Sequence, residues 1–346
     1  MFQHLELLDG ILDPNIKVDV SKEAKPMNNI QPYSVVDWMT KTTDNVLWEF
    51  AQLPNAKRIG TGDRQFVLVE GTRSDRVLLI AHSDTKFNDA KLEIGYDPDK
   101  NELVSLSKTL GIGADDRAGI AMLWRLKDLG HSLLIPNKEE EGCKGSRFLM
   151  EDEQWRKIIN SHRFAIEMDR RNARDLVYYN VGTRLFKVWC EKEFEGYKEA
   201  PGSFTDIGVL CDPQKHKENC ICGLNISVGY YGEHGPSEKL VISEWIHTLE
   251  SLTRVLSKPD IPEFKILYEP YVAPTYTQGK YDGMHNYGYQ AGWSDDYDDG
   301  KTATVTTSVN SDDILNSIVL CSNCDAMMDI SEISPNNKCV YCKKAV

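Results

Sequence analysis

Residues 76–84 read Arg76-Val77-Leu78-Leu79-Ile80-Ala81-His82-Ser83-Asp84, an apolar run that ends at a histidine and an aspartate. A continuous apolar run of this length is typical of a strand that is buried on both faces. Similar runs recur at 132–135, 164–168 and 224–228. Helical patterns alternate with them at 117–129, 145–159 and 238–256. The alternation predicts an α/β fold, a three-layer sandwich with a mostly parallel central sheet. Nearer the N-terminus, the pattern predicts a helix over 34–53 and a strand over 65–70.

Composition narrows the class of protein. The chain has 346 residues, and its hydrophobic content of 41% suffices for a sizeable core. A net charge of −13 argues against general binding of nucleic acid or of anionic membranes, since both need a basic surface. Residues 1–20 do not have the pattern of a secretory signal, and no apolar stretch is long enough to span a bilayer. We therefore expect a cytoplasmic protein.

Five short motifs carry acidic and histidine side chains, each where a strand ends or a helix begins. They are residues 81–84 (Ala-His-Ser-Asp), 113–116 (Gly-Ala-Asp-Asp), 139–142 (Glu-Glu-Glu-Gly), 167–169 (Glu-Met-Asp) and 229–234 (Gly-Tyr-Tyr-Gly-Glu-His). Each motif alone also fits an ordinary feature: a capped strand end, a helix N-cap, a solvated acidic loop, a surface ion pair or a loop histidine. Together they supply the histidines and carboxylates that a pair of hydrolytic zinc ions requires.

The residue types suggest separate tasks within such a site. A neutral His82 could bind zinc while Asp84 orients its ring through the other nitrogen. A carboxylate of the 115–116 pair, which follows a glycine-rich turn, could bridge two cations. In the glutamate triplet 139–141, one glutamate could bind metal while its neighbour acts as a general base.

These motifs, in this order, resemble the co-catalytic di-zinc exopeptidases, which include zinc aminopeptidases and related carboxypeptidases and deacylases. The resemblance covers residues 30–256 and implies the phosphorylase/hydrolase-like fold of that superfamily. It implies that His82, Asp115 and Asp169 hold one zinc, that Asp115, Glu140 and His234 hold the other, and that Asp115 bridges them. It further implies that Glu139 is the general base for a metal-bridged water, with Asp84 behind His82 and Asp116 supporting the turn. If the register of the triplet shifts by one, these roles pass to Glu140 and Glu141.

Substrate contacts are expected from two further segments. The stretch 202–206 (Gly-Ser-Phe-Thr-Asp) resembles a segment that lines the substrate site in these enzymes. There Asp206 could receive a peptide α-amino group, or could simply cap a helix. Tyr230 or Tyr231 could donate a hydrogen bond to the oxyanion of the transition state.

Two Cys-x-x-Cys pairs close the chain, at Cys321 and Cys324 and at Cys339 and Cys342. Their spacing predicts a zinc ribbon with one structural zinc, rather than two disulfides. The other five cysteines (Cys143, Cys190, Cys211, Cys220 and Cys222) are interpreted as packing residues. The predicted organisation is an extension over 1–29, a peptidase domain over 30–260, an acidic and aromatic linker over 261–313 and the ribbon over 314–346.

We therefore expect a zinc-dependent exopeptidase, with an aminopeptidase favoured. Only residues 170–233 separate the fourth ligand from the last histidine, which is too short for the dimerisation domain typical of the carboxypeptidase and deacylase branch. The alternatives are a deacylase or amidohydrolase acting on an N-acyl or other amide-linked small molecule, and a non-catalytic adaptor. The predicted metals are two catalytic zinc ions, replaceable by cobalt or manganese, and one structural zinc. The expected partners are a peptide or small amide substrate, and a protein bound by the ribbon and linker.

Overall fold

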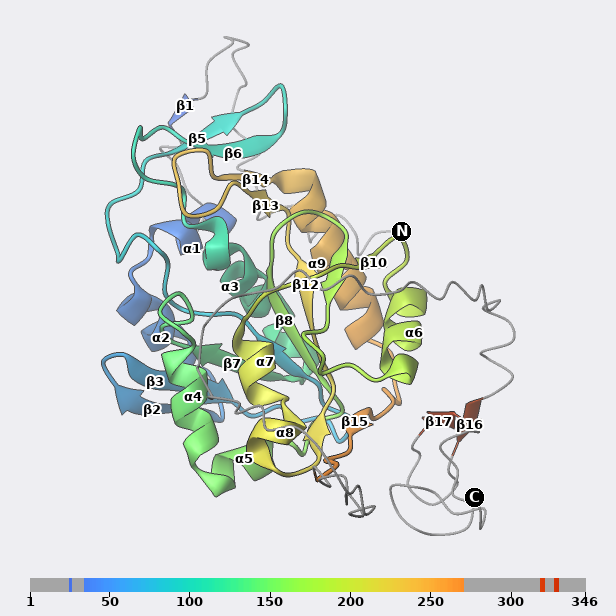
Figure 1. The fold of residues 1–346 in the computed structure, drawn as a ribbon. Coiled ribbons are helices and arrows are strands. Elements are labelled where there is room, and N and C mark those ends of the chain that lie inside the picture. The colour runs from blue at the N-terminus through green and yellow to red at the C-terminus, as the bar shows by residue number, and fades with distance from the viewer. Residues whose placement is uncertain (1–24, 27–33, 271–317, 321–326, 330–346) are drawn as a thin grey trace, which may run out of the picture.

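An eight-stranded sheet forms the centre of the molecule (Figure 1). The structure, a computed structural model, describes residues 25–26, 34–270, 318–320 and 327–329. In spatial order the strands are β10 (Lys198–Glu199), β9 (Asp175–Val177), β12 (Gly223–Ser227), β8 (Ala165–Arg170), β4 (Leu78–Ile80), β7 (Ser132–Pro136), β3 (Arg64–Val69) and β2 (Ala56–Thr61).

The four middle strands of this sheet, β12, β8, β4 and β7, run parallel. Leu79 of β4 lies opposite Leu133 of β7 and Ile166 of β8, so these three strands end at the same edge. All residues of β4, β7 and β12 are buried, as the apolar runs in the sequence predict. Antiparallel pairings occur on either side of this group, between β3 and β7 and between β9 and β12.

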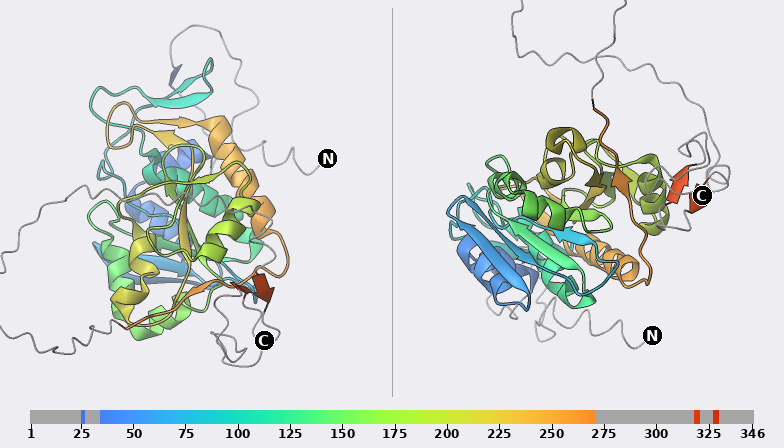
Figure 2. Two further views of the ribbon diagram at one scale, coloured as in Figure 1. Left: turned by 45° about the vertical axis from the view of Figure 1, so that its right-hand side comes forward. Right: turned by 90° about the horizontal axis from the view of Figure 1, so that it is seen from below.

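Helices cover both faces of the sheet and form the two outer layers of the sandwich (Figure 2). One core contains residues of α1 (Val35–Thr40), α2 (Thr43–Ala51), α3 (Ala114–Leu126), α6 (Arg184–Glu193) and α9 (Ile242–Leu256). The other core contains residues of α4 (Lys144–Glu151), α5 (Glu153–Ile159) and α7 (Asp206–Leu210). Leu79 belongs to the first core and Leu78 and Ile80 to the second, because side chains alternate along a strand. The predicted α/β class with a mostly parallel central sheet is confirmed.

Smaller elements complete the described chain. A second, antiparallel sheet contains β1 (Lys25–Pro26), β5 (Ile94–Asp97), β6 (Glu102–Ser105), β14 (Lys239–Val241) and β13 (Tyr230–Tyr231). Two antiparallel pairs join β11 (Cys220–Ile221) to β15 (Lys265–Ile266) and β16 (Ile318–Leu320) to β17 (Met327–Asp329). The 3₁₀ turn η1 (Lys127–Leu129) continues α3, and α8 (Pro213–His216) follows α7.

Two predicted helices differ from the structure. The helix expected over 34–53 is divided into α1 and α2, because Lys41 is extended and the Thr42 hydroxyl accepts a hydrogen bond from Asn45 N–H to start a second helix. The helix expected from residue 238 begins at Ile242, since residues 239–241 pair with β6 instead. The sequence interpretation also missed α6 and the strands β2, β5, β6 and β9.

The C-terminal predictions concern residues outside the described ranges. All four cysteines of the predicted ribbon lie there, as does most of the predicted linker, so both stay predictions. Within the described part of the predicted linker, residues 261–270, Phe264 is buried in the first core and β15 is paired with β11. Among the helices of the described ranges, none combines the length and apolarity needed to cross a bilayer.

Candidate metal centre

Five segments bring imidazole and carboxylate groups together beyond the carboxyl ends of the parallel strands. In open α/β sheets this edge is where ligand sites form. His82 follows β4, Asp115 lies at the start of α3, Glu140 lies between β7 and α4, Asp169 is near the end of β8, and His234 lies between β13 and β14. The sequence separates these residues by up to 152 positions, from 82 to 234, and the topology brings them together.

The first ligand group consists of His82, Asp115 and Asp169. Nε2 of His82 lies 3.2 Å from Oδ1 of Asp115 and 3.6 Å from Oδ1 of Asp169. The second group consists of Asp115, Glu140 and His234. Nε2 of His234 lies 3.0 Å from Oδ2 of Asp115 and 2.8 Å from Oε1 of Glu140. Within each group, the ligand atoms lie within 4.8 Å of one another.

Asp115 belongs to both groups and presents a different oxygen to each histidine. A carboxylate whose two oxygens face two separate sets of ligands is the arrangement that bridges a pair of metal ions. Imidazole nitrogen and carboxylate oxygen are common ligands of zinc. The donor set therefore fits two divalent cations that share Asp115.

Residues around the groups fix the orientation of His82 and of the turn that carries Asp115. Oδ1 of Asp84 lies 3.3 Å from Nδ1 of His82, on the side of the ring opposite the ligand cluster. Asp116 accepts hydrogen bonds from the backbone N–H of His82 (3.2 Å) and of Gly119 (3.1 Å) and thereby joins the end of β4 to α3. The peptide bond between Asp115 and Asp116 is cis.

Glu238 is a supporting residue that the sequence interpretation missed. Its buried carboxylate accepts hydrogen bonds from the backbone N–H groups of Ile112 (2.8 Å), Gly113 (2.9 Å) and Asp115 (3.1 Å). It therefore holds the turn that presents Asp115. The sequence assigned Glu238 to the start of a helix, and no local pattern relates it to a turn more than 120 residues earlier.

The tyrosines predicted to contact substrate have other partners. The Tyr230 hydroxyl donates to the backbone oxygen of Asp169 (3.0 Å) and to its Oδ1 (3.1 Å). The Tyr231 hydroxyl donates to Oε2 of Glu244 in α9 (2.7 Å) and is not directed at the ligand groups. Tyr230 thus contacts Asp169, a member of the first group, and neither hydroxyl is directed at an open position in this structure.

Asp206 lies at the start of α7 and is 0% exposed, so its position does not favour direct contact with a substrate amino group. Its neighbour Thr205 donates to Oδ2 of Asp169 (3.3 Å). The 202–206 segment therefore reaches the site through Thr205, a residue that the sequence interpretation did not single out.

The three glutamates of the triplet occupy three different environments. The side chain of Glu140 is 8% exposed and meets His234. The side chain of Glu141 is 43% exposed and forms ion pairs with Lys138 (2.8 Å) and Lys144 (2.6 Å). The backbone N–H of Glu139 donates to Oδ1 of Asp84 (3.1 Å), which places Glu139 beside the first ligand group.

The pKa values of both histidines in the ligand groups are raised. Burial lowers the pKa of His82, but Asp169 and Asp115 outweigh it and raise that pKa well above its ordinary value. Hydrogen bonds with Asp115 and Glu140 raise the pKa of His234 to about 10. Without another cation, both imidazoles would thus carry protons among the carboxylates. A metal ligand must be a neutral imidazole, so divalent cations would replace these protons, which agrees with the fit of the donor set.

Burial raises the pKa of two carboxyl groups at the site. It raises the pKa of Glu139 to about 9, to which Asp169 and Asp206 contribute while His82 opposes them. It raises the pKa of Asp169 to about 7, with Asp115 as the next cause. Burial is the larger cause in both groups, and the neighbouring carboxylates add to it.

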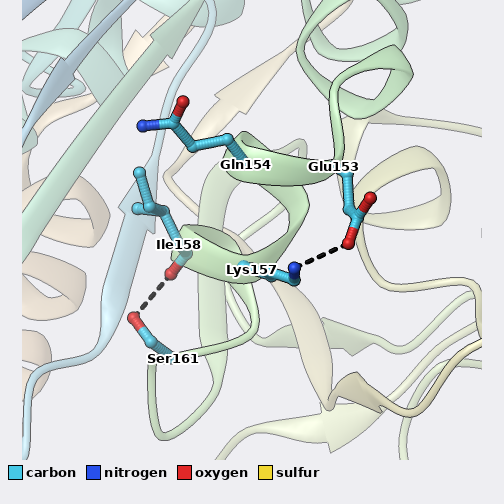
Figure 3. A pocket seen from close by; sticks show the side chains of 5 residues that line it. All are labelled: Glu153, Gln154, Lys157, Ile158 and Ser161. Carbon is cyan, nitrogen blue, oxygen red and sulfur yellow. Dashed lines mark hydrogen bonds and ion pairs between the residues drawn. The ribbon is translucent and has the colours of Figure 1, made fainter.

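A surface hollow on α5 contains none of these ligands. Figure 3 shows its lining residues, and among them Lys157 pairs with Glu153 at 2.6 Å while Ser161 donates to the backbone oxygen of Ile158 at 2.7 Å. The hollow has no cluster of metal-binding or nucleophilic groups, and neither of the two ligand groups lies in it.

Comparison with known proteins gives structural likenesses at low sequence identity. No family model matches the chain, and no curated protein matches it. The structure of aminopeptidase PepT from Bacillus cereus is 14% identical, covering 64% of this chain and 96% of that chain with a TM-score of 0.49. A tripeptidase from Staphylococcus aureus is 11% identical with the same coverages and TM-score. An aminopeptidase from the archaeon Desulfurococcus kamchatkensis is 11% identical, covering 65% and 93%, with a TM-score of 0.46. These identities and TM-scores are too low to carry the function of those proteins over to this chain.

Proposed function

We propose that this chain is a zinc-dependent exopeptidase of the aminopeptidase type. The observation that carries the proposal is the pair of ligand groups that share Asp115, one with His82 and Asp169 and the other with Glu140 and His234. Each group would hold one divalent ion. Zinc is the proposed metal, with cobalt or manganese as replacements that the same ligands would accept.

Two divalent ions in these groups would activate a water molecule and polarise the carbonyl group of the substrate. The protein supplies the proton transfers and the alignment. Glu139 would take the proton released as water attacks the carbonyl carbon and would pass it to the leaving amine when the C–N bond breaks. Its position beside the first ligand group agrees with this role. Burial raises its pKa to about 9 in the absence of metal, and divalent ions in the two groups would favour its ionised form, which is the form that accepts a proton.

Other residues of the site would hold the ligands in place. Asp84 would keep the His82 ring in the tautomer that leaves Nε2 free for metal, since it faces Nδ1. Tyr230 and Thr205 would orient Asp169 through their hydrogen bonds to it. In this proposal Tyr230 supports a ligand rather than the oxyanion, and Asp206 lies behind the site.

The segment between Asp169 and His234 supports the aminopeptidase type. It forms β9, β10 and β12 of the central sheet together with α6, α7, α8 and β11. Its residues complete the sheet and add helices to both layers, α6 to the first core and α7 to the second, and they leave no inserted domain within residues 170–233. This agrees with the compact branch of the exopeptidases rather than with the branch that carries a dimerisation domain.

The test of the reaction is digestion of a peptide library read by mass spectrometry, with metal content measured on the same sample. We expect residues to be released from free amino termini, with two zinc ions at the site and a third if the C-terminal ribbon forms. Cleavage restricted to N-acylated substrates would instead identify a deacylase. A protein that binds no metal beyond the ribbon would refute the metal centre.

Three single variants test the roles within the triplet. Glu139→Gln should retain both zinc ions and lower kcat by about 10²–10⁴-fold, the usual contribution of a general base. Glu140→Gln should lose zinc from the second group. Glu141→Gln is the matched control and should change neither activity nor metal content, because its partners are two surface lysines. Loss of zinc in Glu139→Gln would contradict the assignment.

A further inference from the structure

Cys143 lies against the proposed general base. It is the N-cap residue of α4, directly after the glutamate triplet and Gly142, and its side chain is 0% exposed. Its Sγ lies 3.7 Å from Oε1 of Glu139, within hydrogen-bond distance for a thiol donor. The sequence interpretation of Cys143 as a packing residue is therefore incomplete, although the side chain also belongs to the second core.

The backbone of Cys143 holds the thiol in this position. Its φ of +55° lies in the left-handed region, which costs a residue with a side chain roughly 1–2 kcal/mol relative to the right-handed form. Glycine would avoid that cost. The chain nevertheless has a residue with a side chain at this position. The backbone N–H of Cys143 donates to the oxygen of Glu139 (3.0 Å), and this turn folds the thiol back onto the glutamate.

The carboxylate of Glu139 has few other partners. Among the residues that the structure describes, the Cys143 thiol is the one hydrogen-bond donor to either of its carboxylate oxygens. Burial, with the nearby carboxylates of Asp206 and Glu139, raises the pKa of the thiol far above its ordinary value. The sulfur thus keeps its proton and remains a donor. A thiol is a weak donor, and the bond is strongest when the Glu139 carboxyl group is ionised, which is the form in which it would act as a base.

We propose that the Cys143 thiol is a positioning residue for Glu139, whose S–H donates to Oε1 and leaves Oε2 to accept the proton of the attacking water. The inference rests on the proposed function, because it assumes that Glu139 is the general base. No bond to sulfur forms or breaks in the reaction. The thiol limits rotation of the carboxylate, which would otherwise have to be oriented anew in each catalytic cycle.

Three substitutions distinguish this role from packing. Cys143→Ser keeps a donor but places a smaller, more polar atom in the core. Cys143→Ala removes the donor, and Cys143→Gly removes it while relieving the left-handed backbone. Packing predicts that serine is no better than alanine, whereas positioning predicts that serine restores what alanine and glycine lose. Cys211→Ala is the matched control, since Cys211 is a buried thiol of the same core.

Kinetics of the zinc-loaded enzyme provide the first measurement. We expect kcat to fall about tenfold in Cys143→Ala and Cys143→Gly, equivalent to about 1.4 kcal/mol of barrier, with KM and zinc content unchanged. Cys143→Ser should stay within about threefold of the wild type, and Cys211→Ala should match it. Wild-type kcat in Cys143→Ala, or equal losses in the serine and alanine variants, would overturn the inference.

Infrared spectroscopy of the metal-free protein provides a second measurement that needs no activity. The difference between wild type and Cys143→Ala isolates the S–H stretching band of this thiol. We expect that band at the lowered wavenumber of a hydrogen-bonded thiol, and we expect it to rise in Glu139→Ala, which removes the acceptor whatever its protonation state. A band unmoved by Glu139→Ala would refute the contact. If the wild type hydrolyses no peptide, the proposed function fails, while this measurement still decides the contact.

Discussion

Replacement of Glu238 should weaken both the fold and the metal centre. The carboxylate of Glu238 accepts three backbone hydrogen bonds, from Ile112, Gly113 and Asp115, and its side chain is buried. Two of these bonds go to Oε2 and one to Oε1. The turn that they hold presents Asp115, which belongs to both ligand groups. The perturbation therefore acts on Asp115, the proposed bridging ligand, from outside the two groups.

The structure sets the size of the effect. Glu238→Ala leaves three buried N–H groups without an acceptor, and each such group costs about 1–3 kcal/mol. At the low end of that range, the free energy of unfolding should fall by about 3 kcal/mol. Glu238→Gln keeps one oxygen that can accept from Ile112 and Gly113. Its NH₂ group would face the N–H of Asp115, donor against donor, so the cost of about one unpaired N–H group remains. Loss of support behind a metal ligand typically costs about 10–100-fold in metal affinity.

Urea unfolding of the metal-free protein and competitive zinc titration measure the two effects. The matched control is Glu70→Gln, which removes an exposed ion pair with Lys57 (2.6 Å) at the other edge of the central sheet and should cost less than about 1 kcal/mol. An unfolding midpoint and zinc affinity equal to those of the wild type in Glu238→Ala would refute the reasoning. If the alanine variant does not fold, Glu238→Gln gives the same test at lower cost to stability.

Two further predictions concern Tyr230 and His162. Tyr230→Phe removes both hydrogen bonds to Asp169 and should lower zinc affinity about tenfold in a competition titration, whereas Tyr231→Phe, whose hydroxyl binds Glu244, should leave it unchanged. Burial lowers the pKa of His162 to about 4, so its neutral form is favoured in the folded state. This preference contributes to the free energy of unfolding above pH ~6.5, the pKa of histidine in the unfolded chain. The contribution is lost as pH falls towards 4, and the loss amounts to about 3 kcal/mol at most. His162→Asn should flatten this part of the pH dependence in urea unfolding, and an unchanged slope would contradict the assignment.

The central sheet could be predicted because its parallel strands are buried on both faces. Each then appears in the sequence as an uninterrupted apolar run between polar residues, as at β4 and β7. The strands of the second sheet carry no such signal, since β5 and β6 are only partly buried and mix polar with apolar residues. Helix α6 was missed because Phe186 and Trp189 pack on Phe164 and Phe264, partners that lie far away in the sequence.

The convergence of the candidate ligand residues could be inferred for a related reason. Parallel strands carry the residues that follow them to one edge, so motifs after β4, β7 and β8 converge whatever their separation in the sequence. The supporting residues follow no such rule. Glu238 and Thr205 reach the site from segments whose approach depends on the complete fold, and the sequence around them does not signal it.

The glutamate triplet illustrates what a linear motif leaves undetermined. The backbone oxygen of Glu139 accepts hydrogen bonds from the N–H groups of Gly142 (2.8 Å) and Cys143 (3.0 Å), so the triplet forms a tight turn rather than a strand or helix. Successive side chains of such a turn have different surroundings: Glu139 meets the Cys143 thiol, Glu140 meets His234, and Glu141 pairs with two lysines. The lysines beside Glu141 lower its pKa to about 2, whereas burial raises that of Glu139 to about 9. Identical residues therefore differ in chemistry because the turn separates their surroundings, and a base next to a ligand needs this separation: a glutamate that binds metal cannot also be the group that exchanges the proton.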